Sequence, residues 1–453
     1  MTVVLMAVGC ATHPTPLPEN APPAAVDCAA MFAKLDEAID AHGVRDAQEF
    51  RLPGFPYLRV NRFVASFAGE ARTDDAAREA MLTGMATLDV HARQFESANL
   101  PGDVRATLGA LPLESCSATM LQYGRATPSR VAAILEQARV PDAYADWKRA
   151  LGLYAITSIP FRWGVALWEE STRRKFETAS AAPLTRWLPP PAEAALLRRH
   201  APVFEIDART AVDQFGAPQW TNDGIVVDTR KPGVFTHIAH TRFEGQTLAQ
   251  LIYTLWFPSR PCAGPFDPLC GHLDALTVRL TLDHDDEVLM ADSIHACGCY
   301  HQFFPSSRLV PRPPPDGREE WAFSPASLPV IQKGQRLVFR IASGSHDLFG
   351  IGAMNVDAAE GTRYAMQPAN TLRSLPLPGN AGRRSLYGAD GLVAGTGRGE
   401  RFLFWPMGIA SPGAMRQWGH HATAFVGKRH FDDADLIEKR FARAAQELAV
   451  KVQ

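Results

Sequence analysis

Three common features are missing from this sequence of 453 residues, and each absence excludes a class of protein. The charges nearly balance, with 46 Lys and Arg against 48 Asp and Glu, so there is no basic field to collect nucleic acid. No apolar run approaches the roughly 18–20 residues that a membrane-spanning helix needs. The motifs of α/β-hydrolases, HExxH metalloproteases, P-loop proteins and dinucleotide-binding proteins are also absent. We therefore expect no nucleic-acid partner, and any chemistry has to be argued from individual side chains.

The first 25 residues resemble the start of a bacterial lipoprotein. They read "MTVVLMAVGCATHPTPLPENAPPAA", an apolar stretch that meets Gly9-Cys10 and continues as a Pro- and Ala-rich tail. The "AVGC" segment is similar to the lipobox of that family, with Ala7 where leucine is usual. The resemblance implies a signal peptide, lipidation of Cys10, and a protein of the bacterial cell envelope. Such a protein is tethered to the membrane by its lipid and faces the periplasm or the exterior. The proline-rich tail would be an extended tether.

Cysteine is scarce, with seven in the chain, and setting Cys10 aside leaves an even number. An even remainder suits an oxidising compartment, where cysteines pair. The six are Cys28, Cys116, Cys262, Cys270, Cys297 and Cys299. Cys28 lies on the apolar face of a predicted helix and Cys116 in a predicted loop, so we expect these two to form a disulfide. Cys262 and Cys270 are the natural second pair.

The chain before about residue 200 follows the period of α-helices. From 27 to 43, apolar residues recur at i, i+3, i+4 and i+7, with Asp27 as the expected N-cap and Gly43 as the C-cap. Residues 51–67, "RLPGFPYLRVNRFVASF", are expected to form an irregular segment packed across the helices, or else a loop that faces a ligand. Five further helices are predicted: one after residue 73, one after residue 127, and three over 142–153, 161–176 and 191–200.

Strand signals dominate from about residue 202. The segment "TLAQLIYTLWF" at 247–257 is apolar on both faces, as in a strand between two layers. Residues 274–294 alternate with period two around an acidic turn, which predicts a hairpin. Residues 432–450 are predicted to form an amphipathic helix. We therefore expect an α+β chain in three parts. These are a signal and tether over 1–25, a helical domain over 26–200, and a mostly antiparallel β-rich domain over 201–453 that a C-terminal helix closes.

The strongest candidate site is the stretch "SIHACGCYHQFF" at residues 293–304. It places His295, Cys297, Cys299 and His301 on every second residue, directly after the predicted hairpin. If the second strand of the hairpin continues, all four side chains project from one face, because side chains alternate along a strand. Cα atoms two residues apart lie about 6.5–7 Å from each other, so at most two or three of the four can share one ion.

Further ligands for such an ion are expected from other histidines. His237 and His240 precede the buried strand, and His272 precedes the hairpin. Histidine together with thiolate favours zinc or copper, and zinc is the cofactor we expect. A catalytic site would keep three protein ligands and leave one position open for water. Glu244, close to the first two histidines, is the candidate general base.

Three other interpretations of this stretch stay open. Cys297 and Cys299 could form a disulfide if Gly298 bends the chain. Cys297 could be a nucleophile with His295 or His301 as its base. The residues could also be structural, with cysteines packed in a core and histidines bonded to the backbone. A c-type haem is excluded, because its motif needs two residues between the cysteines and only one is present.

Two functions are therefore expected from the sequence. The first is a membrane-tethered extracytoplasmic lipoprotein whose β-rich domain holds a His/Cys metal site and acts as a metal-dependent hydrolase. The alternative is a non-catalytic envelope lipoprotein that binds a small-molecule or protein partner, with its cysteines in disulfides. The sequence favours no particular substrate for either.

Overall fold

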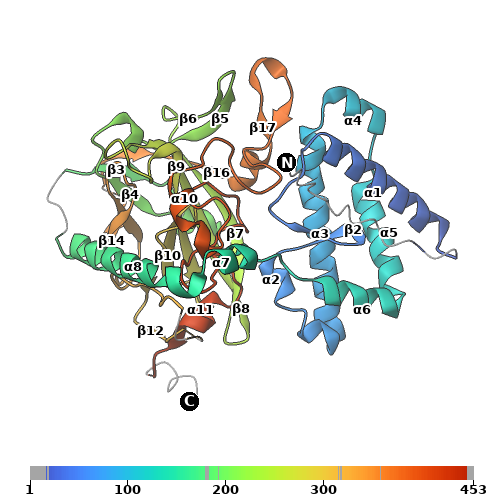
Figure 1. The fold of residues 1–453 in the computed structure, drawn as a ribbon, viewed down its shortest axis with the longest axis horizontal. Coiled ribbons are helices and arrows are strands. Elements are labelled where there is room, and N and C mark those ends of the chain that lie inside the picture. The colour runs from blue at the N-terminus through green and yellow to red at the C-terminus, as the bar shows by residue number, and fades with distance from the viewer. Residues whose placement is uncertain are drawn as a thin grey trace, which may run out of the picture. The chain divides into compact units, whose positions relative to one another are not determined.

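The chain forms two compact units, Met1–Pro141 and Asp142–Gln453. Our structure is a computed structural model, which describes residues 17, 20–178, 183–191, 193–314, 316, 319–357 and 359–445 (Figure 1). Helices and strands occur in both units, so the chain is α+β as expected. None of the described helices combines the length and the apolar character that crossing a membrane requires. Cys10, where lipidation is predicted, lies outside the described residues.

The first unit packs helices around a short hairpin. In chain order its elements are α1 (Pro23–Ala41), β1 (Phe50–Leu52), β2 (Phe55–Val60), α2 (Arg62–Ala65), η1 (Glu70–Arg72), α3 (Asp75–Asn99), α4 (Gly102–Leu108), α5 (Leu113–Arg125) and α6 (Pro128–Gln137). The predicted apolar face of α1 is buried in the core. Asp27 lies inside α1, so the prediction that it caps the helix is wrong.

The segment expected to be irregular is instead the β1–β2 hairpin followed by α2. Leu52 pairs with Phe55, so Pro53 and Gly54 form the whole turn between the strands. Gly54 has a φ of +78°, which glycine adopts at no steric cost, and proline favours the position before it in a tight turn. Proline therefore begins a turn here and does not disrupt a strand.

A network of buried charges joins the hairpin to α3. The Arg59 guanidinium on β2 donates to Asp89 Oδ1 at 3.1 Å and to Glu96 Oε2 at 2.7 Å. Arg93 Nε donates to Asp89 Oδ2 at 2.7 Å. All four side chains are fully buried, so these ion pairs hold β2 against one face of α3.

Both predicted disulfides are present. Cys28 on α1 is bonded to Cys116 on α5 with an S–S distance of 2.02 Å, and Cys262 is bonded to Cys270 at 2.06 Å. Within the described residues, each unit therefore carries one disulfide. Such bonds are typical of an oxidising, extracytoplasmic location.

The second unit is built on two sheets. The larger sheet has the strand order β11-β10-β9-β8-β7-β16, and the smaller has the order β14-β13-β4-β3-β15. The strands of the larger sheet are β7 (Gly233–Phe243), β8 (Gln246–Arg260), β9 (Gly271–Leu282), β10 (Val288–His295), β11 (Gln302–Pro305) and β16 (Ala365–Pro368). Those of the smaller sheet are β3 (Thr185–Leu188), β4 (Val203–Ile206), β13 (Gln335–Ile341), β14 (Leu348–Asn355) and β15 (Thr362–Arg363).

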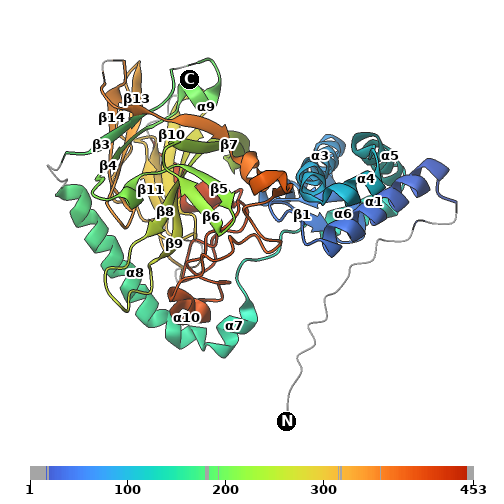
Figure 2. The same cartoon turned by 90° about the horizontal axis from the view of Figure 1, so that it is seen from above.

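The main core of this unit lies between the two sheets (Figure 2). Phe204 on β4 and Phe339 on β13 belong to the same buried cluster as Leu251 on β8 and Leu280 on β9. The β8 strand and the β9–β10 hairpin were both predicted from their apolar patterns. Neighbouring strands from β7 to β11 pair antiparallel, and β16 pairs parallel with β7.

Short elements and helices complete the second unit. The short pairs are β5 (Ala217–Thr221) with β6 (Gly224–Asp228), β12 (Leu309–Pro311) with β19 (Phe441–Arg443), and β17 (Leu375–Pro376) with β18 (Arg383–Arg384). The helices are α7 (Asp146–Leu151), α8 (Tyr154–Glu177), α9 (Leu196–Arg199), α10 (Glu400–Phe404) and α11 (Leu436–Arg440), with 3-10 turns η2 (Ala211–Asp213), η3 (Ala369–Arg373), η4 (Pro378–Asn380) and η5 (Trp405–Met407). Thus α7, α8 and α9 lie within the range 26–200 for which a helical domain is predicted.

The predicted helix over 432–450 is not found in the described part of that range. Only α11 is helical there, and the chain continues as β19, which pairs antiparallel with β12. Ile437 and Phe441 are buried together, and the helical spacing between them had indicated one continuous helix. Residues 446–450 lie outside the described residues.

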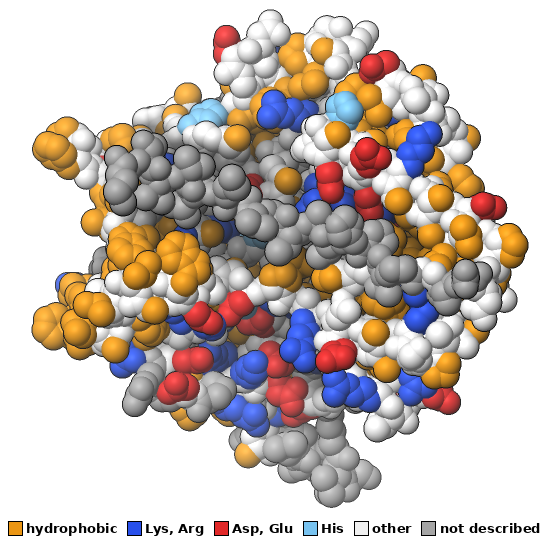
Figure 3. All heavy atoms as spheres, turned by 45° about the vertical axis from the view of Figure 1, so that its right-hand side comes forward, with side chains coloured by type: hydrophobic (Ala, Val, Ile, Leu, Met, Phe, Trp, Pro, Cys, Tyr) orange, Lys and Arg blue, Asp and Glu red, His pale blue; other side chains and the backbone are white. Residues whose placement is uncertain are grey.

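Charge of one sign does not gather on the face of the molecule drawn in Figure 3. Blue Lys and Arg side chains lie next to red Asp and Glu side chains there. This mixture agrees with the formal net charge of −2 for the whole chain.

Candidate functional site

The candidate stretch after β10 forms a tight turn. β10 ends at His295, and the chain then reverses and returns as β11. Gly298 has a φ of +91°, and a Cβ atom at that position would lie 2.4 Å from the carbonyl oxygen of Ala422. Only glycine fits there, and it permits the turn. Because β10 ends at His295, the prediction that the strand continues to His301 with four ligands on one face is wrong.

The turn brings two thiols to a carboxylate from a distant part of the chain. One ligand atom each from Cys297, Cys299 and Glu400 lie within 4.8 Å of one another. Among the described residues, this is the group of His, Cys, Asp and Glu that is compact enough to hold a metal ion. Both cysteines are free thiols, and the backbone N–H of Cys299 donates to the Cys297 sulfur at 3.4 Å.

Glu400 reaches the thiols because a glycine makes room for it. Glu400 is the first residue of α10, and its backbone N–H donates to the Pro268 carbonyl oxygen at 3.0 Å. A Cβ atom at Gly413 would lie 2.2 Å from Glu400 Oε1. The Cys262–Cys270 loop therefore fixes the start of α10, and Gly413 leaves space for the carboxyl group.

Positive groups surround the cluster. Arg398 Nη2 donates to Asp274 Oδ1 at 3.0 Å, and Arg416 Nε donates to the Cys297 carbonyl oxygen at 3.0 Å. Both guanidiniums are buried, so their charges act in a medium of low dielectric. They compensate negative charge on the thiols and on Glu400.

The ionisation of the three ligand groups is coupled. A hydrogen bond from Cys299, followed by the charges of Arg398 and His295, lowers the pKa of the Cys297 thiol to about 6, against the opposing effect of burial. The pKa of Cys299 is raised well above its usual value, first by that same hydrogen bond and then by burial. Burial, and then the nearby Cys297, raise the pKa of Glu400 to about 8. The three groups therefore resist carrying three negative charges together.

His295 lies between two carboxylates behind the turn. Its Nδ1 is 3.6 Å from Asp274 Oδ1, and its Nε2 is 3.2 Å from Asp347 Oδ1. Burial lowers the pKa of this histidine, but the two carboxylates outweigh burial and raise it to about 9. Asp274 also accepts a hydrogen bond from His346 Nδ1 at 2.8 Å. His295 is therefore a buried cation next to the thiols.

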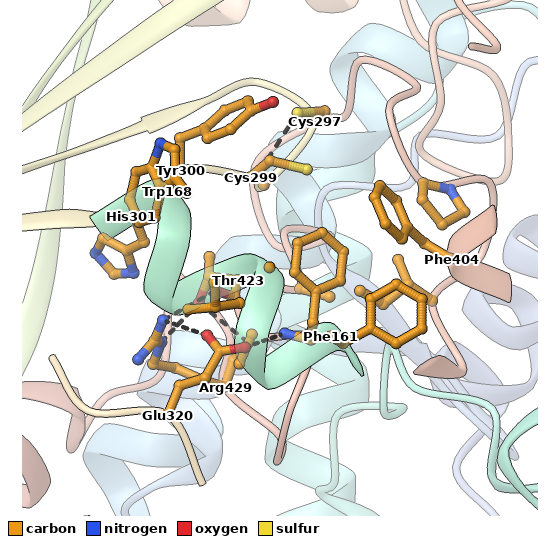
Figure 4. A pocket seen from close by; sticks show the side chains of 18 of the residues that line it. Phe161, Trp168, Cys297, Cys299, Tyr300, His301, Glu320, Phe404, Thr423 and Arg429 are labelled. Carbon is orange, nitrogen blue, oxygen red and sulfur yellow. Dashed lines mark hydrogen bonds and ion pairs between the residues drawn. The ribbon is translucent and has the colours of Figure 1, made fainter. Parts of the chain in front are cut away.

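A cavity of about 240 Å³ opens beside the cluster (Figure 4). Cys297, Cys299 and Glu400 lie in its wall. The rest of the wall is mostly apolar and includes the aromatic residues Phe161, Trp168, Phe323, Phe404 and Phe425. On the opposite side, Glu320 accepts hydrogen bonds from the backbone N–H groups of Phe425 and Val426 at 2.8 and 2.9 Å. The cavity thus offers an apolar surface to a ligand and a compact polar group in its wall.

His301 has a different environment from the thiols. It lines the cavity, but its Nε2 bonds to Asp292 Oδ2 at 2.8 Å, and Asp292 also accepts from Arg279 Nε at 2.8 Å. Burial lowers the pKa of His301 to about 3, so the ring is neutral. Its ring stacks on Phe303 at 4.0 Å. It is not part of the compact ligand group.

The other predicted ligands also lie outside that group. His237 on β7 packs its ring edge-on against Trp418 at 4.6 Å. His240 is exposed on the same strand, and His272 Nε2 bonds to the Ile225 carbonyl oxygen at 2.9 Å. Glu244 is exposed in the β7–β8 turn, where its carboxylate accepts from Arg443 Nε at 3.0 Å. The structure therefore brings two of the seven predicted metal ligands together, Cys297 and Cys299.

Sequence reasoning missed Glu400 and Arg398. Glu400 lies about a hundred residues after the cysteines, in a segment that reads as a flexible loop, so only the fold brings it to them. The "GSHD" segment at residues 344–347 supplies His346 and Asp347 to the surroundings of His295.

Comparisons with known proteins do not assign this site. The chain matches no family model and no curated protein. It is similar to a solved structure described as "Toxin fold for microbial attack and plant defense", at 11% sequence identity, over 41% of this chain and 79% of that chain, with a TM-score of 0.21. A likeness this weak bears on neither fold nor function.

Proposed function

We propose that the second unit binds zinc through Cys297, Cys299 and Glu400 and acts as a zinc-dependent hydrolase. The observation that carries this proposal is the approach of three ligand atoms within 4.8 Å in the wall of a cavity. Two sulfur ligands and one carboxylate oxygen suit zinc, which takes both types at about 2.0–2.3 Å. Three protein ligands leave one position of a tetrahedral ion for water or substrate.

The residues around the cluster suit this chemistry. A bound zinc ion would polarise a substrate carbonyl and lower the pKa of a bound water. Arg398, Arg416 and cationic His295 offset the negative charge of the ligands. The apolar wall would exclude water and hold an apolar part of the substrate. The cavity is smaller than the roughly 300–1,000 Å³ of drug-sized sites, which favours a small substrate group.

The same proposal places the protein at the bacterial cell envelope. The two disulfides support an extracytoplasmic location, and the "AVGC" segment supports lipidation of Cys10. A fatty-acid analogue supplied to expressing cells should label the chain and should not label Cys10→Ser. Equal labelling of the two chains would contradict the lipid anchor.

The metal site is tested by zinc content. We expect one zinc per chain in protein purified from an oxidising compartment, and loss of that zinc in Cys299→Ser and Glu400→Gln. His240→Ala is the matched control, because sequence alone predicts it as a ligand and the structure places it outside the group. Loaded wild type should hydrolyse a panel of short acyl esters and amides, and Glu400→Gln should not.

Three outcomes would contradict the proposal. The first is equal zinc in wild type and Cys299→Ser. The second is a Cys297–Cys299 disulfide in the purified protein, found by peptide mapping without reduction. The third is zinc binding with no hydrolysis of any substrate in the panel, which would leave a metal-binding protein without this activity.

A further inference from the structure

The second unit exposes an unusual amount of apolar surface on one group of helices. Of 17 large hydrophobic residues that are exposed in the described chain, ten lie in two short segments, seven over 147–167 and three over 402–405. Scattered exposed hydrophobics are normal, whereas a cluster of this size marks an interaction surface. The surface includes Trp147, Leu151, Ile156, Ile159, Trp163 and Leu167, each more than half exposed.

The spacing along α8 shows that one face of this helix is both apolar and exposed. Ile156, Ile159, Trp163 and Leu167 follow one another at intervals of three and four residues, so they share a face. Trp163 is the most exposed of them, at 73%. The opposite face carries Phe161 and Trp168, which line the cavity. The first half of α8 is therefore apolar on both sides, although only one side is buried.

The helix α10 extends this surface. Phe404 on α10 packs its ring against Phe161 on α8 at 5.3 Å, which leaves Phe402 and Leu403 exposed at the same end of the molecule. Gly152, between α7 and α8, lets η5 come close, since a Cβ atom there would lie 2.5 Å from Pro406. Figure 2 shows α7, α10 and the beginning of α8 side by side. We call these exposed apolar residues of α7, α8 and α10 the helical face.

Basic groups outnumber acidic ones on this face, where Asp146 of α7 is exposed and pairs with Lys428 at 2.8 Å. Residues 147–168 contain Lys148 and Arg162 and no Asp or Glu, and the third basic residue, Arg149, donates inward to the carbonyl oxygens of Met407 and Gly427. Arg401 on α10 is exposed, and Glu400 beside it is buried. Lys148 and Arg401 lie over the rings of Trp147 and Phe402. A surface of tryptophan, aliphatic residues and basic groups complements an anionic lipid surface, where indole rings favour the interface and basic groups meet phosphates.

We propose that the helical face docks onto the surface of an anionic lipid bilayer, with Trp163 and its apolar neighbours inserted among the headgroups. This docking is separate from the zinc site and from acylation of Cys10, so it can be tested without either.

The test uses the full chain with Cys10→Ser in every sample, so that no acyl chain at that residue contributes. Protein is floated with phosphatidylcholine vesicles that contain or lack phosphatidylglycerol. We expect binding to the anionic vesicles that weakens with added salt. The triple variant Ile156→Gln, Trp163→Gln and Leu167→Gln should lower the partition coefficient by roughly tenfold or more, because large apolar side chains leave the lipid.

The matched control changes three exposed apolar residues elsewhere, Val226→Gln, Ile238→Gln and Val330→Gln, and should bind like the parent. Brominated lipids give a second measurement that needs no triple variant. They should quench tryptophan fluorescence of the parent and quench Trp147→Phe/Trp163→Phe much less. Equal partitioning of both triple variants, or no quenching of the parent, would overturn the proposal. So would a parent that dimerises through this face, as light scattering would show, and does not bind vesicles.

Discussion

The two units bury charge in different ways. In the first unit, Arg59 and Arg93 meet carboxylates of α3 inside a seam of helix and hairpin. In the second unit, the buried cation His295 lies behind two thiols in the wall of a cavity, and neither of its ring nitrogens has a well-aligned hydrogen bond. Buried charge alone therefore does not mark a functional site. The difference is whether the charged groups are fully paired with one another or lie beside a cavity that a ligand can enter.

The described part of each unit also has one disulfide. Removing these two disulfides should give the largest difference in unfolding free energy between the units. The Cys28–Cys116 bond spans 88 residues and the Cys262–Cys270 bond spans 8. In the chain-entropy model these loops correspond to about 4.6 and about 2.5 kcal/mol of unfolding free energy. We expect Cys28→Ser/Cys116→Ser to destabilise the first unit by nearly twice as much as Cys262→Ser/Cys270→Ser destabilises the second.

The two units can be followed separately. All nine tryptophans lie in the second unit, so their fluorescence reports its unfolding, while far-UV circular dichroism reports both. Denaturation of each double variant by urea gives the comparison. If removing the Cys262–Cys270 disulfide lowers the unfolding free energy as much as removing the Cys28–Cys116 disulfide, chain entropy does not explain the stabilisation.

Breaking the buried ion pairs of the first unit should give the next largest loss of unfolding free energy. Arg59→Met leaves the negative charges of Asp89 and Glu96 less compensated, and both carboxylates are fully buried. We expect this to lower the unfolding free energy of the first unit by about 3–5 kcal/mol. Arg45→Met is the control, because its partner Asp40 is exposed and such surface pairs contribute about 1 kcal/mol or less. The dichroism transition should shift in Arg59→Met while the fluorescence transition stays in place. If the dichroism transition shifts as little as in Arg45→Met, the buried ion pairs of Arg59 do not stabilise the first unit.

The sequence was most informative where pattern and contact are local. The β9–β10 hairpin follows from alternation along two neighbouring strands, and the Cys262–Cys270 disulfide joins cysteines close in sequence. The Cys28–Cys116 disulfide was also predicted, but the prediction that Cys116 lies in a loop is wrong, because it lies on α5. The turn after β10 was misjudged, because the positive φ of Gly298 depends on the close Ala422 carbonyl, which sequence spacing does not show. Residue 441 was misjudged for a related reason. Phe441 is buried as predicted, but it is buried from a strand, which short apolar patterns do not distinguish from a helix.

The same limit applies to the site. Cys297 and Cys299 stand out in the sequence because two cysteines flank one glycine. Glu400 does not stand out, since one glutamate among the 48 acidic residues of the chain has no distinguishing neighbour. The histidines that sequence spacing favoured are held by carboxylates, carbonyl oxygens or aromatic rings. Long-range contacts decide which polar residues meet, and local patterns carry no information about them.

The smallest effect on stability is expected at the zinc ligands, and it would complete the comparison. Without zinc, Glu400→Gln should change the unfolding free energy of the second unit by about 1 kcal/mol or less, because glutamine has the same shape and avoids burying a carboxylate. With zinc at about a hundred times its dissociation constant, wild type should gain about 2.7 kcal/mol and the variant should gain nothing. Tryptophan fluorescence during urea denaturation, with and without zinc, measures both. A large loss in Glu400→Gln without zinc would instead make Glu400 a structural residue like Arg59, and an equal gain from zinc in both proteins would place the ion elsewhere.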